Sequence, residues 1–166
     1  MHEPSAIFAG TEIAQLFARL KVTHVIWIPD STTGRWESAL ATHASLRLIR
    51  ICREGEAWPL AAGLLLGGQR PIVIMQSTGF FESGDALRNI WKDLQLPVFA
   101  IIGARNWLTD ASRDSAKQFL MPLLQAWKVE YCIVESREQQ EEIASCYERA
   151  ICEQRAGVVV LAEGTG

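Results

Sequence analysis

The stretch PVFAII, residues 97–102, decides the fold class, because it is a continuous apolar run that ends at Gly103. A strand buried on both faces of a parallel sheet is apolar throughout, whereas a half-exposed strand alternates apolar and polar residues. We therefore expect residues 97–102 to form a central strand of a parallel sheet.

Apolar segments of strand length alternate with amphipathic segments of helix length on both sides of this run. Five further strands are predicted at residues 23–28, 46–51, 71–75, 129–134 and 157–162. Helices are predicted at residues 11–20, 34–43, 56–67, 85–92 and 118–127, and from 136 to about 155. The alternation is typical of an α/β fold with a single doubly wound, mainly parallel sheet of about six strands and helices on both faces. One domain is expected, over residues 1–166.

Local signals predict how several of these helices begin. Thr11 is the predicted N-cap of the first helix, and Ser136 that of the last, with Gln139 in the reciprocal capping-box position. Pro122 is expected near the start of its helix, where a proline is tolerated. Residues 76–79 are expected to form a polar, flexible turn after the third strand.

The charge balance argues against two classes of partner. The chain has 16 Lys and Arg against 19 Asp and Glu, a formal net charge of −3, and no run of like charges. A nucleic-acid or membrane surface would require concentrated positive charge. No apolar run reaches the roughly 18 residues of a membrane span. We therefore expect neither nucleic acid nor a membrane as a partner.

Cysteines and histidines give no sign of a metal site. Cys52, Cys132, Cys146 and Cys152 lack any C-x-x-C pairing, so we expect reduced thiols and a cytoplasmic location. His2, His24 and His43 lack the spacing of metal ligands, so this chain alone is expected to bind none. The motifs G-x-G-x-x-G, G-x-x-x-x-G-K-[ST] and G-x-S-x-G are absent, which argues against nucleotide-binding and hydrolase templates.

Ligands of parallel sheets bind outside the carboxyl ends of the strands, so the strand-to-helix turns are the candidate sites. Four polar turns stand there, at residues 29–31, 53–56, 76–79 and 103–106. Structural roles would also explain them: Glu54 and Glu56 could complement a helix dipole, and Asp30 could cap a helix.

Three of these turns, in order and spacing, resemble the pyrimidine-binding domain of thiamine-diphosphate enzymes, specifically the sulfopyruvate and phosphonopyruvate decarboxylase group. Ile28-Pro29-Asp30-Ser31 looks like the family's V-P-D-S. Glu54-Gly55-Glu56-Ala57, followed by Leu60-Ala61-Ala62-Gly63, looks like E-G-N-A-x-x-L-A-A-G. Met75-Gln76-Ser77-Thr78-Gly79 looks like M-Q-[NS]-[ST]-G, and the similarity covers most of the chain.

The resemblance implies a role for each turn. In this family a glutamate nine residues before the last glycine of the helix motif hydrogen-bonds a ring nitrogen of the coenzyme's aminopyrimidine, and counting back from Gly63 assigns this catalytic role to Glu54. The residues implied to bind the cofactor are Glu54, Gln76, Ser77, Thr78 and Gly79. The candidates for substrate binding are Asp30, Ser31, Phe80, Phe81 and Arg105.

Half of such a site is absent from this sequence. The family holds the diphosphate through Mg²⁺ bound by G-D-G and a later Asn, whereas Gly84-Asp85-Ala86 lacks the third glycine and is interpreted as coincidence. The resemblance therefore implies thiamine diphosphate as cofactor and a separate pyrophosphate-domain (β) subunit that carries the Mg²⁺. This chain would be the α subunit of a homo- or hetero-oligomer, inactive alone.

The implied activity is decarboxylation of a small 2-oxo acid, with 3-sulfopyruvate first and 3-phosphonopyruvate next. Phe80-Phe81-Glu82 stands where relatives continue L-G-N, and Glu82 would serve an anionic substrate poorly. Arg105, Arg113 and Lys117 could supply compensating positive charge. The alternative is a non-catalytic pyrimidine-domain relative that acts as a regulatory or assembly subunit.

Overall fold

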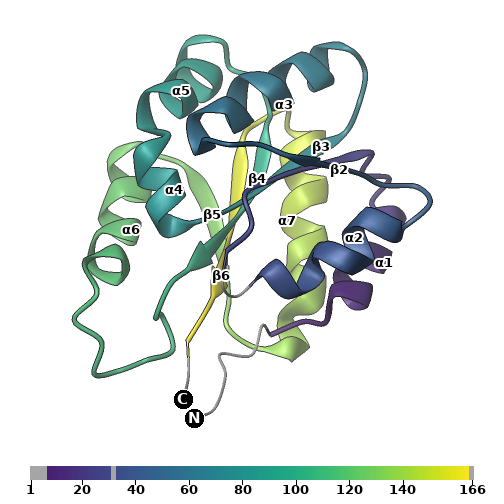
Figure 1. Cartoon of the computed structure of the whole chain (residues 1–166). Coiled ribbons are helices and arrows are strands. Elements are labelled where there is room, and N and C mark those ends of the chain that lie inside the picture. Colours follow the sequence, from purple (N-terminus) through teal and green to yellow (C-terminus); the bar gives the residue numbers. More distant parts are fainter. Residues whose placement is uncertain (1–6, 31–32, 165–166) are drawn as a thin grey trace.

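The six strands of the protein form one parallel sheet (Figure 1). The computed structural model describes residues 7–30 and 33–164. The strands are β1 (His24–Trp27), β2 (Arg47–Arg50), β3 (Pro71–Gln76), β4 (Phe99–Ala104), β5 (Glu130–Val134) and β6 (Gly157–Ala162), in the order β2-β1-β3-β4-β6-β5. The prediction of a parallel α/β sheet of about six strands is confirmed.

Helices cover both faces of the sheet (Figure 1). On one face lie α1 (Gly10–Arg19), α2 (Glu37–Thr42) and α7 (Gln140–Cys152). On the other lie α3 (Ala57–Leu66), α4 (Ser77–Glu82), α5 (Gly84–Arg88) and α6 (Ser115–Ala126). Short turns complete the chain: the 3₁₀ turns η1 (Thr33–Trp36), η2 (Glu54–Glu56) and η4 (Arg137–Gln139), and the π-helical turn η3 (Asn89–Asp93).

Strand β4 is central, as its apolar run predicts. All six of its residues are buried, and it pairs with β3 on one side and β6 on the other. Phe99 and Ile101 belong to the core beneath α1 and α7, whereas Ala100 and Ile102 belong to the core beneath α3 and α6. The alternation along the strand therefore fills two cores, which is why no polar residue can stand in it.

Two of the predicted helix starts and one predicted turn are wrong. Helix α1 begins before Thr11, with Ala9 at the N-cap and the Glu12 carboxylate accepting from the Ala9 backbone N–H at 2.7 Å. No flexible turn separates β3 from α4, because the strand includes Gln76 and the helix begins at Ser77. Pro122 lies inside α6, because the Asp114 side chain caps that helix three residues earlier than expected.

The capping box predicted at the start of the last helical segment is present. The Gln139 side-chain oxygen accepts from the Ser136 backbone N–H at 3.1 Å and from that of Glu135 at 2.7 Å. The cap opens the turn η4, which leads directly into α7. A local sequence signal of this kind works because all its partners lie within four residues.

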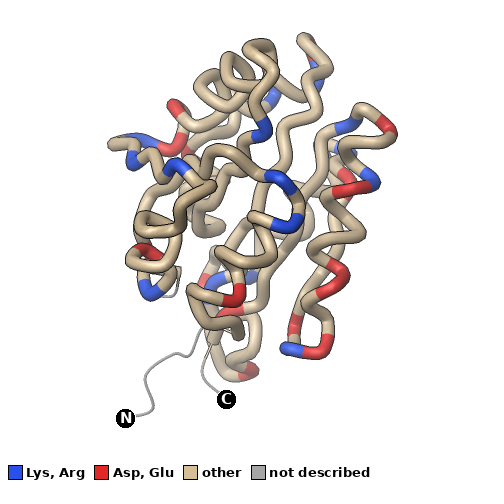
Figure 2. Tube along the Cα trace, turned by 90° about the vertical axis from the view of Figure 1, so that its right-hand side faces the viewer, with Lys and Arg blue, Asp and Glu red and all other residues tan. Residues whose placement is uncertain are grey.

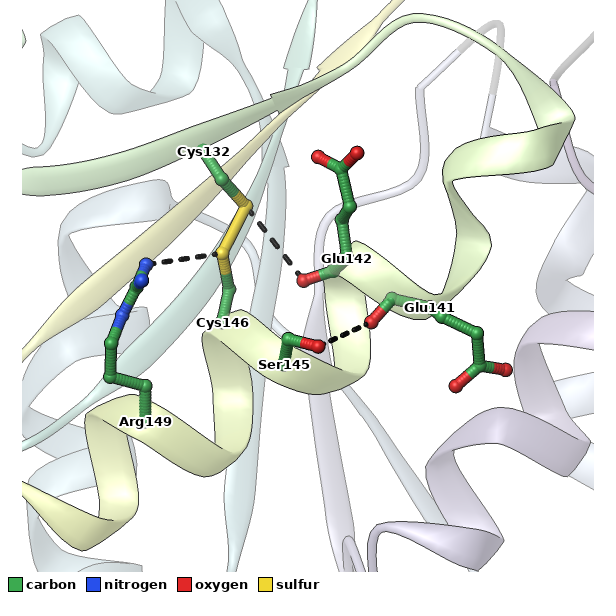
Figure 3. The surroundings of a disulfide bond; sticks show 6 residues. All are labelled: Cys132, Glu141, Glu142, Ser145, Cys146 and Arg149. Carbon is green, nitrogen blue, oxygen red and sulfur yellow. Dashed lines mark hydrogen bonds between the residues drawn. A yellow bond between two sulfur atoms is a disulfide. The ribbon is translucent and has the colours of Figure 1, made fainter.

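The expectation of four reduced thiols is wrong for two of them. Cys132 on β5 and Cys146 on α7 form a disulfide, with Cα atoms 6.8 Å apart, that links the edge strand to the helix covering it (Figure 3). Cys52 and Cys152 are exposed free thiols. The spacing of 14 residues hides this pair in the sequence, because the two cysteines meet only when α7 folds back over β5.

Charged residues are interspersed along helices and turns (Figure 2), and many of them pair. Arg19 and Glu141 approach to 2.7 Å, joining α1 to α7, and Arg50 and Glu37 approach to 2.6 Å. Exposed pairs of this kind contribute about 0–1 kcal/mol each. Within residues 7–30 and 33–164, no helix is long and apolar enough to cross a membrane.

Replacing the buried Leu120 of α6 by alanine should lower the free energy of unfolding by about 2–5 kcal/mol, because it leaves a cavity between helix and sheet. The matched control is Leu66→Ala at the end of α3, where the side chain is 76% exposed and the change should be within about 0.5 kcal/mol. Chemical denaturation of both variants measures the difference, and equal effects would contradict this description of the core.

Candidate functional site

The carboxyl ends of the parallel strands bring most of the predicted site residues to one edge of the sheet. The residues that follow the strand ends there are Asp30 after β1, Glu54 after β2, Ser77 after β3, Arg105 after β4 and Glu163 after β6. Four of these five come from turns that the sequence marks as candidate sites.

Glu54 opens the turn η2, and its side chain lies directly on Gly79 in α4. A Cβ atom at Gly79 would stand 2.7 Å from the Glu54 Oε1 and 2.8 Å from its Cδ, distances that real Cβ atoms do not show. The glycine at this position is therefore required for the Glu54 side chain to lie where it does. Two residues from separate predicted turns thus form one contact.

Glu54 and Glu56 differ in their hydrogen bonds within the chain. The Glu56 carboxylate accepts from the Cys52 backbone N–H at 3.3 Å, which closes its own turn. The half-buried Glu54 makes no hydrogen bond or salt bridge within the described part of the chain, so its oxygens keep their capacity to bind a donor. One Glu56 oxygen is thus engaged within the chain, whereas neither Glu54 oxygen is.

Glu82 holds the turn that carries Glu54. Its carboxylate accepts from the Arg53 side chain and from the Gly55 backbone N–H, the latter at 3.0 Å. The hydrogen bond from Arg53 lowers the pKa of the Glu82 carboxyl below its usual value, and the Gly55 N–H acts in the same direction. The acid expected to disturb an anionic substrate is therefore bound to the two residues that flank Glu54.

The segment after β3 provides both buried and exposed polar groups. The Gln76 side-chain nitrogen donates to the Glu163 carboxylate at 3.2 Å. Ser77 is fully buried, and its hydroxyl oxygen lacks a hydrogen-bond partner among the described residues. Thr78 is exposed, and Gly79 lies beneath Glu54. The predicted cofactor residues Gln76 to Gly79 therefore adjoin both Glu54 and Glu163.

The two phenylalanines after Gly79 point to different environments. Phe80 is fully buried and packs in the core against Trp127, with ring centroids 6.0 Å apart, so the structure does not bring it to the site. Phe81 is partly exposed and lines an apolar groove between α4 and α6, which also includes Phe119 and Trp127. As a substrate residue, Phe81 stays a prediction.

The positive charges near this edge are largely engaged. The Arg105 Nε donates to the Asp114 carboxylate at 2.6 Å, and the Lys117 ammonium donates to the Thr109 carbonyl at 3.0 Å. The pKa of Asp114 is lowered, first by the Ala116 backbone N–H that it caps and then by its side-chain donors. Arg113 is exposed in the same loop.

Asp30 has a clear structural role. Its two carboxylate oxygens accept from the Thr33 backbone N–H at 2.7 Å and from the Thr33 hydroxyl at 2.5 Å, which caps the turn η1. Its neighbour Ser31, the other candidate from this turn, lies outside the described residues. A substrate role for either residue stays a prediction.

Glu163 is not among the site residues predicted from the sequence. This residue is only 3% exposed, follows β6, and lies over Gly103 of β4, where an added Cβ would stand 2.8 Å from its Cδ. An acidic residue directly after the buried strand GVVVLA was the available signal, since it marks the same edge as the other turns. It belongs to none of the three motifs.

The fragment Gly84-Asp85-Ala86 lies in α5, where Asp85 pairs with Arg88 at 2.9 Å. Among the residues that the structure describes, no group of three or more His, Cys, Asp or Glu side chains is arranged to hold a metal ion. The interpretation of this fragment as coincidence stays a prediction.

Known proteins match this chain in sequence and in fold. Over 58 residues it is 34% identical to the sulfopyruvate decarboxylase subunit alpha of Methanocaldococcus jannaschii, covering 35% of this chain and 34% of that protein. The fold matches the crystal structure of benzoylformate decarboxylase from Polynucleobacter necessarius with a TM-score of 0.68, at 18% identity, over 93% of this chain and 29% of that one. No protein-family model matches.

The sequence match supports the resemblance to the sulfopyruvate decarboxylase group, and the structural match supports the fold. The family resemblance and the fold expected from it are thereby confirmed. The matched regions span only 34% and 29% of the two proteins. The activity, substrate and partner of this chain are therefore proposals. The individual roles of Glu54 and its neighbours likewise stay predictions.

Gly79→Ala should displace the Glu54 side chain and lower the free energy of unfolding by about 1–3 kcal/mol, because the new methyl group overlaps it. Gly63→Ala is the control, since that helical glycine has open space around its Cβ position and should gain up to about 1 kcal/mol. In a Glu54→Ala background the cost of Gly79→Ala should shrink. An unchanged cost, measured by chemical denaturation, would contradict the contact.

Glu82→Gln should destabilise the chain at neutral pH and not at low pH. The pKa of Glu82 is lowered in the folded chain, so its contribution is present above the ordinary glutamate pKa of about 4.3 and is lost as pH falls through the folded value. Thermal unfolding from pH 7 to pH 3 measures the change. Glu148→Gln, at an exposed position, is the control. If the difference in stability between Glu82→Gln and the wild type persists at pH 3, the pairing is contradicted.

Proposed function

We propose that this chain is the pyrimidine-binding half of a thiamine-diphosphate-dependent 2-oxo-acid decarboxylase, in which Glu54 is the catalytic acid. The observation that carries the proposal is the Glu54 side chain, which is packed on Gly79 at the carboxyl edge of the sheet while its oxygens keep their hydrogen-bonding capacity. The sulfopyruvate decarboxylase subunit alpha that matches part of the chain supports the same family.

The residues at this edge fit the pyrimidine part of the cofactor. Gly79 has no side chain and so lets Glu54 lie against α4, and Gln76 and the exposed Thr78 offer polar groups beside it. Glu54 would hydrogen-bond a ring nitrogen, and a carboxyl group shielded from water is suited to this. When bound, thiamine diphosphate accepts the electron pair released as carbon dioxide leaves.

A partner subunit would complete the site. This chain supplies no G-D-G motif with a downstream Asn, so the proposal assigns the diphosphate and its Mg²⁺ to a pyrophosphate-domain (β) subunit. The name of the matched relative, a subunit alpha, supports such a partner. The exposed groove between α4 and α6, lined by Phe81 and Phe119, is a surface on which that subunit could dock.

The proposed substrate is 3-sulfopyruvate, with 3-phosphonopyruvate next. Both carry two anionic groups, yet Arg53 is paired with Glu82 and Arg105 with Asp114. Arg105 remains about half exposed and has further donors, and Arg113 is exposed in the same loop, so these two residues could contact an anion. Most of the positive charge would then come from the partner.

The test is turnover of 3-sulfopyruvate by this chain mixed with thiamine diphosphate, Mg²⁺ and a pyrophosphate-domain subunit, sought first among proteins encoded beside it. Glu54→Gln should lower kcat by roughly 10²- to 10⁴-fold, because the amide cannot take up or release the proton. Glu56→Gln is the matched control, two residues away, and should retain most of the activity. The chain alone should be inactive.

Unchanged turnover by Glu54→Gln, with Glu56→Gln inactive, would move the catalytic role to Glu56. Full activity of the isolated chain would overturn the division of the site between two subunits. Cofactor binding without turnover of any sulfonate, phosphonate or carboxylate 2-oxo acid would favour a regulatory or assembly subunit instead.

A further inference from the structure

Glu163 is the one acidic residue whose side chain is buried among the residues that the structure describes. It follows β6 at the same edge of the sheet as Glu54, and its carboxylate lies over Gly103 of the neighbouring strand β4. Burial of a carboxylate costs several kcal/mol unless hydrogen bonds compensate, and the Gln76 amide supplies one of them.

The carboxylate of Glu163 contacts Gln76, a residue of the proposed cofactor site. The Gln76 Nε2 donates to the Glu163 Oε2 at 3.2 Å, across a separation of 87 residues in the sequence. Gln76 pairs in register with Gly103, so the amide and the carboxylate meet above adjacent strands. The contact therefore depends on the sheet and not on a local turn.

A carboxylate can only accept hydrogen bonds, whereas a glutamine amide both donates and accepts. The contact is made by the Gln76 Nε2, so it fixes which end of the amide faces Glu163. The amide oxygen is then left on the opposite side, as an acceptor for an N–H or O–H group. Without the carboxylate, the amide could turn by 180° and present a donor instead.

We propose that Glu163 is a positioning residue, which holds the Gln76 amide so that its oxygen is presented to the ligand at the carboxyl edge of the sheet. This inference rests on the proposed function, because it takes Gln76 as a ligand-contacting residue. It adds that the ligand group beside Gln76 is a hydrogen-bond donor, such as an amino or hydroxyl group. Glu163 acts through Gln76.

The first experiment needs neither cofactor nor partner. In ¹⁵N-labelled full-length chain, the side-chain NH₂ resonances of Gln76 are identified by their loss in Gln76→Ala. Glu163→Gln should shift them, since a glutamine can pair with Gln76 in either orientation. Gly103→Ala should shift them as well, because its methyl group would overlap the Glu163 carboxyl, while Gly63→Ala should leave them unchanged.

The second experiment measures coupling in the complex with its pyrophosphate-domain partner, thiamine diphosphate and Mg²⁺. Glu163→Gln should lower kcat/KM for 3-sulfopyruvate by roughly 10- to 100-fold, as expected when a contacting group is misplaced. In a Gln76→Ala background, the same substitution should cause no further loss. A structural role alone would lower the melting temperature without this dependence on Gln76.

The outcomes separate the inference from the proposed function. The positioning role is overturned if the Gln76 resonances do not shift in Glu163→Gln. It is also overturned if the losses of kcat/KM in Glu163→Gln and Gln76→Ala multiply in the double variant. Shifted resonances, together with non-additive losses, support it. Retained turnover in Glu54→Gln would count against the proposed catalytic role of Glu54, and leaves the spectroscopic result on Glu163 to stand on its own.

Discussion

The burial of β4 on both faces is the constraint from which the rest of the structure follows. With helices above and below it, the backbone groups of this strand find hydrogen-bond partners only in its neighbours β3 and β6. Parallel pairing requires a crossover between successive strands, and the helices supply it. As a result all strands end at the same edge, where the segments carrying Glu54, Gln76 and Glu163 meet.

Two glycines at that edge make the arrangement of acids possible. Glu54 lies on Gly79 and Glu163 lies on Gly103, and in each case a Cβ atom on the glycine would overlap the carboxyl side chain. Packing therefore helps to set the position of both acids; Glu163 also accepts a hydrogen bond from Gln76, whereas Glu54 has none within the described chain. This leaves the Glu54 oxygens available for a ligand, which a carboxylate anchored by its own hydrogen bonds would not be.

The strands were predictable from sequence because continuous apolar runs such as residues 97–102 occur where both faces are buried. Features that depend on tertiary packing were not. The disulfide needs α7 to lie across β5 before Cys132 and Cys146 meet. Phe80 and Phe81 look equivalent in sequence, yet successive residues of a helix point about 100° apart, so one enters the core and the other the groove.

The turns were predictable as sites. Which of their acids have structural roles was not predictable, because this depends on which carboxylates accept hydrogen bonds from other residues of the chain. The Glu82 carboxylate accepts hydrogen bonds from Arg53 and Gly55, and the Asp30 carboxylate accepts hydrogen bonds from Thr33. The Asp114 carboxylate accepts hydrogen bonds from Arg105, Asn106 and Ala116. These contacts explain the three acids as structural. Glu54 differs, because its stem is packed while its carboxylate has no such contact in the described chain. An acceptor of this kind is one half of a hydrogen bond, and none of the residues that the structure describes supplies its donor.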